Sequence, residues 1–123
     1  MMVFEGLAGA TGATPGFRIN RLVLEPDREA GRYRYRMLIV RQGGKAEQDV
    51  RGSYEIVATI DRQGRGANIT FPPDSGNPSY RVTFRHFQRI DGVIAIPAGA
   101  TLKSVEVRFL QDGQIRARAT AAA

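Results

Sequence analysis

Apolar and polar residues alternate along most of the chain from residue 17 onward, in short runs separated by turn-forming residues. Successive side chains of a β-strand point to opposite faces, so this alternation predicts strands with one buried and one exposed face. The clearest run places Tyr33, Tyr35, Met37 and Ile39 on one face and Arg32, Arg34 and Arg36 on the other. The same pattern recurs in further runs, whose apolar positions are Val50, Gly52, Tyr54, Ile56, Ala58 and Ile60; Ala67, Ile69 and Phe71; Tyr80, Val82 and Phe84; Val105, Val107 and Phe109; and Ile115, Ala117 and Ala119.

Turn-forming residues indicate where neighbouring strands join. Glycine adopts the positive φ angles that tight hairpin turns require, so residue pairs containing it predict such turns. These pairs are Gly43-Gly44, Gln63-Gly64, Asp91-Gly92 and Asp112-Gly113. The prolines within residues 25–27 and 71–74 predict longer loops, because proline cannot donate to a strand ladder. Seven or eight short strands predict an all-β fold, a single antiparallel β-sandwich of the immunoglobulin-like or jelly-roll-like kind, with an open barrel as the alternative.

The alternation slips by one residue at two places. Phe84 and Phe87 are three residues apart, and so are Ile19 and Leu22. A β-bulge inserts one extra residue into a strand, which produces this spacing. We therefore expect bulges at Arg85-His86 and at Asn20-Arg21, with both phenylalanines in the core.

Length and composition indicate one folded domain. A chain of 123 residues with 42% hydrophobic and 24% charged residues is ordinary for a globular protein with its own core. Residues 1–16 are rich in small residues, which predicts a flexible linker or a remnant of a longer chain, and residues 17–120 form the predicted sandwich. Residues 1–16 lack the basic and apolar regions of a secretory signal. No apolar run reaches the roughly 18 residues that a membrane helix needs.

No residue pattern predicts catalysis, a metal site or a cofactor. The chain has no cysteine, which excludes disulfides and thiolate metal sites, and His86 is its one histidine. Because no second metal ligand or nucleophile lies near His86 in sequence, we favour a structural role at a bulge or sheet rim over a binding contact. Glu25, Asp27 and Glu29 lie close together but lack the ligand spacing of a calcium loop, so we expect solvated charges there. We therefore do not expect an enzyme.

Arginine dominates the charge of the chain. The net charge is +6, and only two of the 18 basic residues are lysines. Arg32, Arg34 and Arg36 occupy alternate positions about 7 Å apart on a strand, close to the spacing of phosphates in an extended nucleic acid. With Arg116 and Arg118 on another strand, they form a candidate anion-binding face for nucleic acid or acidic lipid. The pattern adds no exposed aromatic residue for base stacking, so a solvated sheet face is the favoured interpretation.

Two segments of the chain resemble a known family. They are the run FRHFQRIDG (residues 84–92), followed by Ile94, Ile96, Pro97 and Gly99, and the run Tyr33-Arg34-Tyr35-Arg36, which leads to Val50-Arg51-Gly52. Over roughly residues 17–110 the chain is similar to the C-terminal β domain of uncharacterised proteobacterial proteins that have one N-terminal transmembrane helix and a coiled coil. The resemblance implies a domain on the periplasmic side of the inner membrane, with no catalytic residues to carry over. Since residues 1–16 provide neither the anchor nor the coiled coil, we expect an excised domain.

These observations favour a non-catalytic interaction or assembly domain, the extracytoplasmic part of a membrane-anchored envelope protein. The expected partner is a protein, either an envelope component or a second copy of the chain. The alternative function is polyanion binding through the arginine face, and the alternative location is the cytoplasm. Edge strands leave room for pairing with another strand, unless Arg41 and Lys45 around Gly43-Gly44 protect such an edge.

Overall fold

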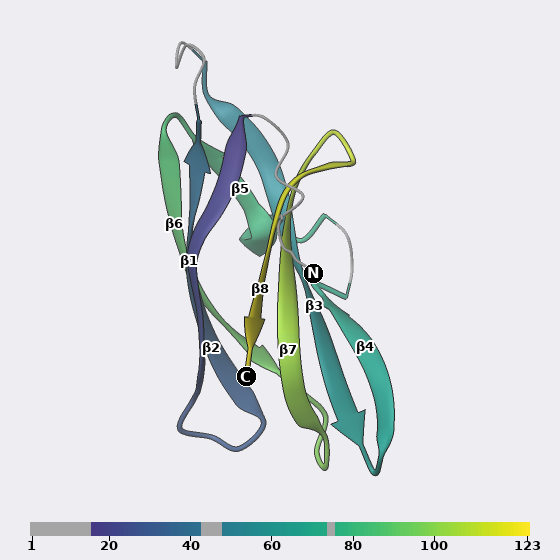
Figure 1. The fold of residues 1–123 in the computed structure, drawn as a ribbon. Helices are drawn as coiled ribbons and strands as arrows, with labels where there is room; N and C mark the ends of the chain where they lie inside the picture. The colour runs from purple at the N-terminus through teal and green to yellow at the C-terminus, as the bar shows by residue number, and fades with distance from the viewer. Residues whose placement is uncertain (1–15, 43–47, 74–75) are drawn as a thin grey trace, which may run out of the picture.

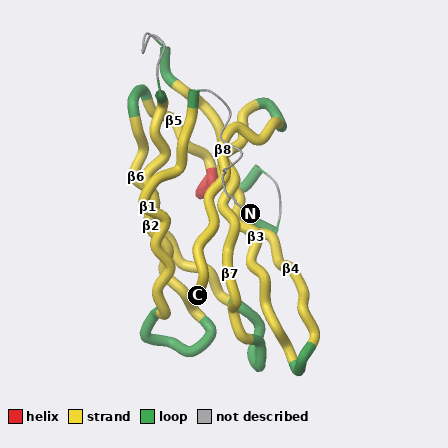
Figure 2. Tube along the Cα trace, viewed as in Figure 1, coloured by secondary structure: helices red, strands yellow, loops and turns green. Residues whose placement is uncertain are grey.

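The chain folds into two antiparallel β-sheets that pack face to face (Figure 1). The structure is a computed structural model that describes residues 16–42, 48–73 and 76–123. Its strands are β1 (Phe17–Pro26), β2 (Arg32–Arg41), β3 (Val50–Arg62), β4 (Arg65–Phe71), β5 (Arg81–Phe84), β6 (Phe87–Ala95), β7 (Thr101–Gln111) and β8 (Gln114–Ala122), with a 3-10 turn, η1 (Pro78–Tyr80), before β5. Figure 2 shows this short helical turn among the strands. The predicted all-β sandwich of seven or eight strands is confirmed.

Three strands form one sheet and five strands form the other. Sheet A has the order β1-β2-β6, and sheet B has the order β4-β3-β7-β8, with β5 also paired to β3. β5 pairs with residues 50–53 of β3 and β4 pairs with residues 56–62, so β4 and β5 share one edge of sheet B. β1 packs beside β8, and β5 packs beside β6. The two sheets therefore meet along both sides of the sandwich.

The core lies between the inner faces of the two sheets. Tyr35, Met37 and Ile39 of β2 are buried, as the alternation predicted. Most predicted inner positions of β3 and β7 are buried too, and only Gly52 is half-buried. The buried ones are Val50, Tyr54, Ile56, Ala58, Ile60, Val105, Val107 and Phe109. The Phe109 ring is fully buried and its centre lies 5.1 Å from that of Phe17. Burial of each of the valine, isoleucine, methionine and phenylalanine side chains contributes roughly 1.5–3 kcal/mol, so these inner faces are the main source of stability.

Two of the predicted tight turns join hairpins. Gln63-Gly64 connects β3 to β4, and Asp112-Gly113 connects β7 to β8, with positive φ at all of these residues. The predicted turn at Gly43-Gly44 and the first 15 residues of the predicted linker lie outside the described residues. At the other end, β8 continues to Ala122 rather than ending at residue 120. Within the described residues no helix is long and apolar enough to cross a membrane.

The predicted turn at Asp91-Gly92 is wrong. Both residues lie inside β6, where Asp91 pairs with Arg36 and Gly92 pairs with Tyr35. Gly92 does not have a positive φ, and its function here is to leave space. A Cβ atom at this position would overlap the ring and hydroxyl of Tyr35. Glycine is therefore required at position 92 by the close approach of the Tyr35 side chain, not by a turn.

One predicted bulge is confirmed and the other is wrong. The register of β1 and β2 shifts between Asn20 and Val23, and Arg21 has a φ of 56°. At Arg85-His86, by contrast, the chain leaves β5 in sheet B and enters β6 in sheet A. These two residues form a corner between the sheets. The alternation of β5 therefore does not continue into β6, and the side chain after the corner can point outward. Phe84 is buried as expected, whereas Phe87 is 61% exposed on the outer face of sheet A.

A bulge that we did not predict interrupts β8. Leu110 pairs with Ile115 and Phe109 pairs with Ala117, so Arg116 is an extra residue in β8. Ala117 is fully buried, but Ile115 lies beside Leu110 on the outer face of sheet B and is only half-buried. The prediction that Ile115 shares the inner face with Ala117 is therefore wrong.

Candidate functional site

The predicted arginines of β2 are exposed on sheet A, and each one pairs with an acidic residue. The N–O distances are 3.7 Å for Arg32–Glu29, 3.4 Å for Arg34–Asp27 and 3.4 Å for Arg36–Glu25. In the register of the β1–β2 hairpin Glu25 lies opposite Arg34, and its ion pair with Arg36 is diagonal, to the next outward-facing residue of β2. Exposed ion pairs contribute at most about 1 kcal/mol each. They nevertheless neutralise this arginine row and weaken its attraction for a polyanion.

The other two predicted arginines lie on the opposite sheet. Arg118 is exposed on β8 and pairs with Arg108 on the outer face of sheet B. Arg116 places its guanidinium carbon 5.2 Å from the centre of the Phe17 ring, where the π electrons attract the charge. The outer faces of two packed sheets point in opposite directions. The prediction that all five arginines form one basic face is therefore wrong.

The outer face of sheet A carries exposed apolar side chains. Among the described residues, the exposed large hydrophobic side chains are Val23 (40%), Phe87 (61%) and Val93 (38%), and all of them lie on this face. Leu38 and Val40 of β2 are half-buried on the same face, and Val40 is the direct cross-strand neighbour of Phe87. Single exposed apolar side chains are ordinary on a protein surface, but a group of them on one small sheet makes this face a candidate site.

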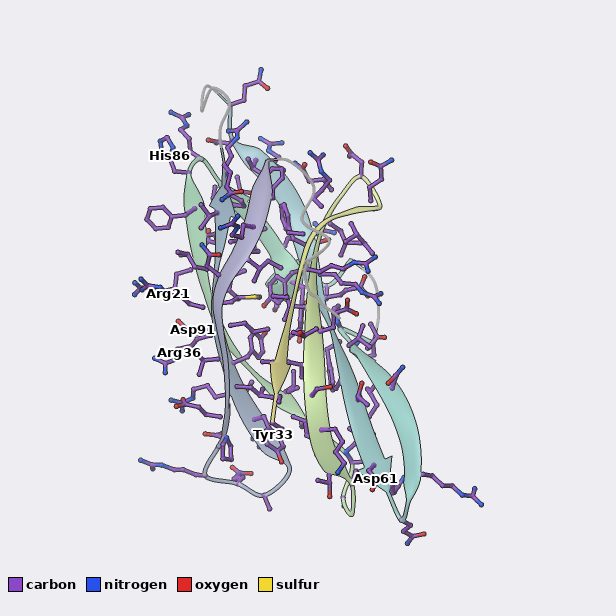
Figure 3. The ribbon with its side chains drawn as sticks, viewed as in Figure 1. Arg21, Tyr33, Arg36, Asp61, His86 and Asp91 are labelled. Atoms are coloured by element: carbon purple, nitrogen blue, oxygen red, sulfur yellow. The ribbon has the colours of Figure 1, made fainter. Side chains whose placement is uncertain are left out.

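Three arginines surround these apolar side chains. Arg18 lies opposite Val40, and Arg89 lies opposite Leu38. Arg21 extends outward from the β1 bulge, on the same side of the molecule as Arg36 and Asp91 (Figure 3). None of these three arginines forms a salt bridge with another residue that the structure describes. We call this group the A-face patch; it consists of Arg18, Arg21, Val23, Leu38, Val40, Phe87 and Arg89.

Two shallow hollows lie on this face. One has a volume of about 420 Å³ and is lined by patch residues, among them Arg21, Val23 and Arg89. The other, of about 470 Å³, shares Arg36 and Asp91 with it and continues toward Val93. Small ligands are usually held in concave sites that bury most of their surface. Open depressions such as these would leave most of a small ligand exposed.

His86 lies at the exposed corner between β5 and β6 (Figure 3). Its backbone carbonyl accepts a hydrogen bond from the Arg41 backbone N–H at 2.9 Å. The Arg41 guanidinium donates to the carbonyls of Gln48 and Arg85, so this side chain ties the corner to the end of β2. Lys45, the other residue expected to protect an edge, lies outside the described residues. No group of three metal-binding side chains occurs in the described part of the chain.

A third hollow, of about 450 Å³, opens where the pairing of β3 passes from β5 to β4. Tyr54, Glu55, Tyr80 and Arg81 line it. The Tyr54 hydroxyl lies 2.9 Å from the Tyr35 hydroxyl, and the two form a buried hydrogen bond between the sheets. Burial raises the pKa of Tyr35 far above its usual range, with a further contribution from the hydrogen bond, and burial also raises the pKa of Tyr54. The bond between these two hydroxyls links β2 of sheet A to β3 of sheet B.

Comparison with protein families identifies a family for this chain. A model described as a family of unknown function (DUF6776) matches residues 1–107, which include the predicted linker and end within β7. No curated protein and no solved structure matches the chain.

Proposed function

The chain belongs to this family of unknown function (DUF6776), and we propose that it is a non-catalytic docking domain. It binds an acidic and partly apolar protein surface at the A-face patch. The observation that carries the proposal is Phe87, an aromatic ring that is 61% exposed on a face with three arginines lacking acidic partners among the described residues. Aromatic and arginine side chains are enriched among the residues that dominate protein interfaces energetically.

The layout of the patch supports a protein partner. Protein interfaces have a core that loses its water and a polar rim that remains hydrated. Phe87 and Val40 are direct neighbours on adjacent strands, and Leu38 continues the apolar surface along β2. Arg18 and Arg89 border these side chains on the flanking strands. Burial of the apolar centre stabilises a complex by roughly 25 cal/mol for each Å² removed from water.

The charges of the patch favour an acidic partner. The arginine row on β2 already has Glu25, Asp27 and Glu29 as partners, whereas the patch arginines have none among the described residues. A guanidinium binds a carboxylate through two parallel hydrogen bonds, which gives both orientation and energy. A partner with carboxylates placed around an apolar side chain complements both features of the patch.

A single-stranded nucleic acid is the second candidate ligand. The observation in its favour is again Phe87, because an exposed aromatic ring beside arginines is a stacking platform for bases. Single-strand binders commonly stack successive bases on several aromatic rings. The remaining apolar side chains of the patch, Val23, Leu38 and Val40, are aliphatic and do not stack in this way. A protein partner is therefore favoured.

Two triple variants that remove equal charge test which arginines bind. The patch variant is Arg18→Ser/Arg21→Ser/Arg89→Ser, and the row variant is Arg32→Ser/Arg34→Ser/Arg36→Ser. The purified chain is titrated by fluorescence anisotropy with a labelled acidic amphipathic peptide rich in Glu and Leu. We expect the patch variant to weaken binding about tenfold or more, and the row variant to weaken it less than about threefold, because acids already neutralise the row. Equal losses would show that net charge alone drives binding and would contradict the proposal.

Salt and the Phe87→Ser variant separate a protein ligand from nucleic acid. Binding of a labelled oligothymidylate falls steeply with salt, because each phosphate contact releases counterions. We expect binding of the peptide to persist at physiological salt, where apolar contact contributes, and to fall about tenfold in Phe87→Ser. If the oligothymidylate binds at physiological salt and the peptide does not, nucleic acid becomes the better assignment.

The location of the domain stays a prediction. We propose that it works on the periplasmic side of the inner membrane, as part of a membrane-anchored protein with a coiled coil. The support for this placement is the resemblance of residues 33–36 and 84–92 to domains of that kind. An acidic envelope protein is then the expected partner of the A-face patch.

A further inference from the structure

The strand β4 forms an edge of sheet B that sheet A leaves largely uncovered. It pairs with β3, and Figure 1 shows it on the side of the molecule away from β1, β2 and β6. Ala67 lies opposite the buried Ile60 and so faces inward, yet Ala67 is exposed. The next inward positions, Ile69 and Phe71, are only half-buried. The alternation correctly predicted one apolar face for this strand, but three strands are too few to cover it.

The other described edges carry features that oppose pairing with a further strand. Natural sheets protect their edges with bulges, charges, prolines or covering elements. β1 has the bulge at Arg21, and β8 has the bulge at Arg116 and packs beside β1. β6 carries Asp91 and packs in part beside β5. By contrast, residues 66–71 of β4 contain no charge and no proline.

We propose that β4 pairs antiparallel with β4 of a second copy of the chain, about a twofold axis at Asn68. Directly opposed residues of an antiparallel pair share a face, so a twofold axis must bring one residue opposite itself. An axis at Asn68 uses the whole strand, because Arg65 and Phe71 are equally far from its centre. Ala67 then lies opposite the partner's Ile69, and Arg65 lies opposite the partner's Phe71.

This pairing is self-complementary in polarity and charge. The inward apolar side chains cover each other across the new strand pair, and the sheet continues through both copies. No like charges face each other, and each arginine meets an aromatic ring, which attracts a cation. The β4 edge of each copy is occupied by the other copy, so no β4 edge remains for a third chain. The pairing therefore gives a closed dimer rather than a fibre.

Salt distinguishes this dimer from binding at the A-face patch. Each copy carries a net charge of +6, so the two copies repel each other, and added salt screens that repulsion. We therefore expect the dimer to become tighter as salt increases. Binding of an acidic partner to the A-face patch becomes weaker under the same change. Their opposite salt dependence means that the dimer proposal and the docking proposal can be disproved separately.

Sedimentation velocity of the 123-residue chain over a wide concentration range measures its oligomeric state and so tests the proposal. An inward-pointing charge is a natural edge-protecting feature, so we expect Ala67→Lys to raise the dimer dissociation constant about tenfold or more. The matched control is Ala98→Lys, the same substitution at an exposed position between β6 and β7. A chain that is monomeric throughout, or a dimer that Ala67→Lys leaves intact, would overturn the proposal.

A cysteine variant provides a second test that does not depend on Ala67→Lys folding normally. The chain has no cysteine, so Asn68→Cys introduces a single thiol. Directly opposed Cβ atoms lie about 4.5–5.5 Å apart, close enough for a disulfide after a small adjustment. We expect mild oxidation to convert Asn68→Cys to a covalent dimer at least about tenfold faster than Ala98→Cys, as the effective concentration at a paired edge is high. Equal rates for the two variants would exclude the axis at Asn68.

Discussion

Gly92→Ala is expected to lower the free energy of unfolding by about 2–3 kcal/mol, although alanine is otherwise the better residue within a strand. The added methyl group would overlap the ring and hydroxyl of Tyr35, which lies opposite on β2. The ring cannot move aside easily, because it is only 3% exposed and its hydroxyl is bonded to that of Tyr54. The strand must therefore shift, or the buried hydrogen bond must break. Overpacking of this kind accounts for the expected loss.

Gly66→Ala is the matched control for this substitution. Gly66 also lies within a strand and has no positive φ, but a Cβ atom there would meet nothing closer than 4.0 Å. We expect Gly66→Ala to be neutral or to stabilise the fold by up to about 1 kcal/mol, since it reduces the freedom of the unfolded chain. Urea denaturation followed by circular dichroism measures both variants. Similar losses at both positions would mean that the contact with Tyr35 is not the cause.

The fold is also expected to lose stability steeply above about pH 10, where tyrosine in the unfolded chain releases its proton. Burial raises the pKa of Tyr35 well above this range, with a further contribution from its hydrogen bond to Tyr54. The native chain therefore keeps a proton that the unfolded chain has lost, and unfolding becomes more favourable as pH rises. The contribution is fully present below about pH 10 and is lost at about 1.4 kcal/mol per pH unit above it. Two pH units then remove roughly 3 kcal/mol, and the raised pKa of Tyr54 acts in the same direction.

Urea midpoints measured from about pH 8 to about pH 12 test this slope. Tyr35→Phe removes one of the two buried groups and is expected to reduce the alkaline slope by about 1.4 kcal/mol per pH unit. At neutral pH the same variant costs about 1–3 kcal/mol, because the Tyr54 hydroxyl loses its buried partner. A stability that stays constant to about pH 12 would contradict the assignment of this pair as a protonated structural bond.

The strand faces were predictable because alternation depends on residues close in sequence. Most of the predicted inner positions of β2, β3 and β7 are buried as expected, whereas Tyr33 and Gly52 are only half-buried. Features that depend on pairing with a second strand were harder to predict from the sequence. A slip in the alternation has the same appearance for a bulge, as at Arg21, and for a corner between sheets, as at His86. Likewise Gly92 has the sequence signature of a turn, and only its pairing with Tyr35 shows that its small size is required.

The candidate site was predictable only in part for the same reason. Alternation placed the arginine row on an exposed face of β2, but the acidic partners of that row come from the β1–β2 hairpin and its loop. We did not predict the A-face patch. The position of Arg18 between the buried Phe17 and Ile19 was a local signal for its exposure. Phe87 gave no such signal, because its exposure follows from the corner that moves the chain from sheet B to sheet A.

The most direct test of the docking proposal is photo-crosslinking from residue 87 of the full-length protein in its native cells. A photo-reactive amino acid replaces Phe87, and the same amino acid at Thr120, exposed on the outer face of sheet B, is the control. We predict a protein adduct from residue 87 that disappears in the patch variant and persists in the row variant, with no such adduct from residue 120. An adduct that forms equally from residue 120, or that survives loss of Arg18, Arg21 and Arg89, would contradict docking at the A-face patch.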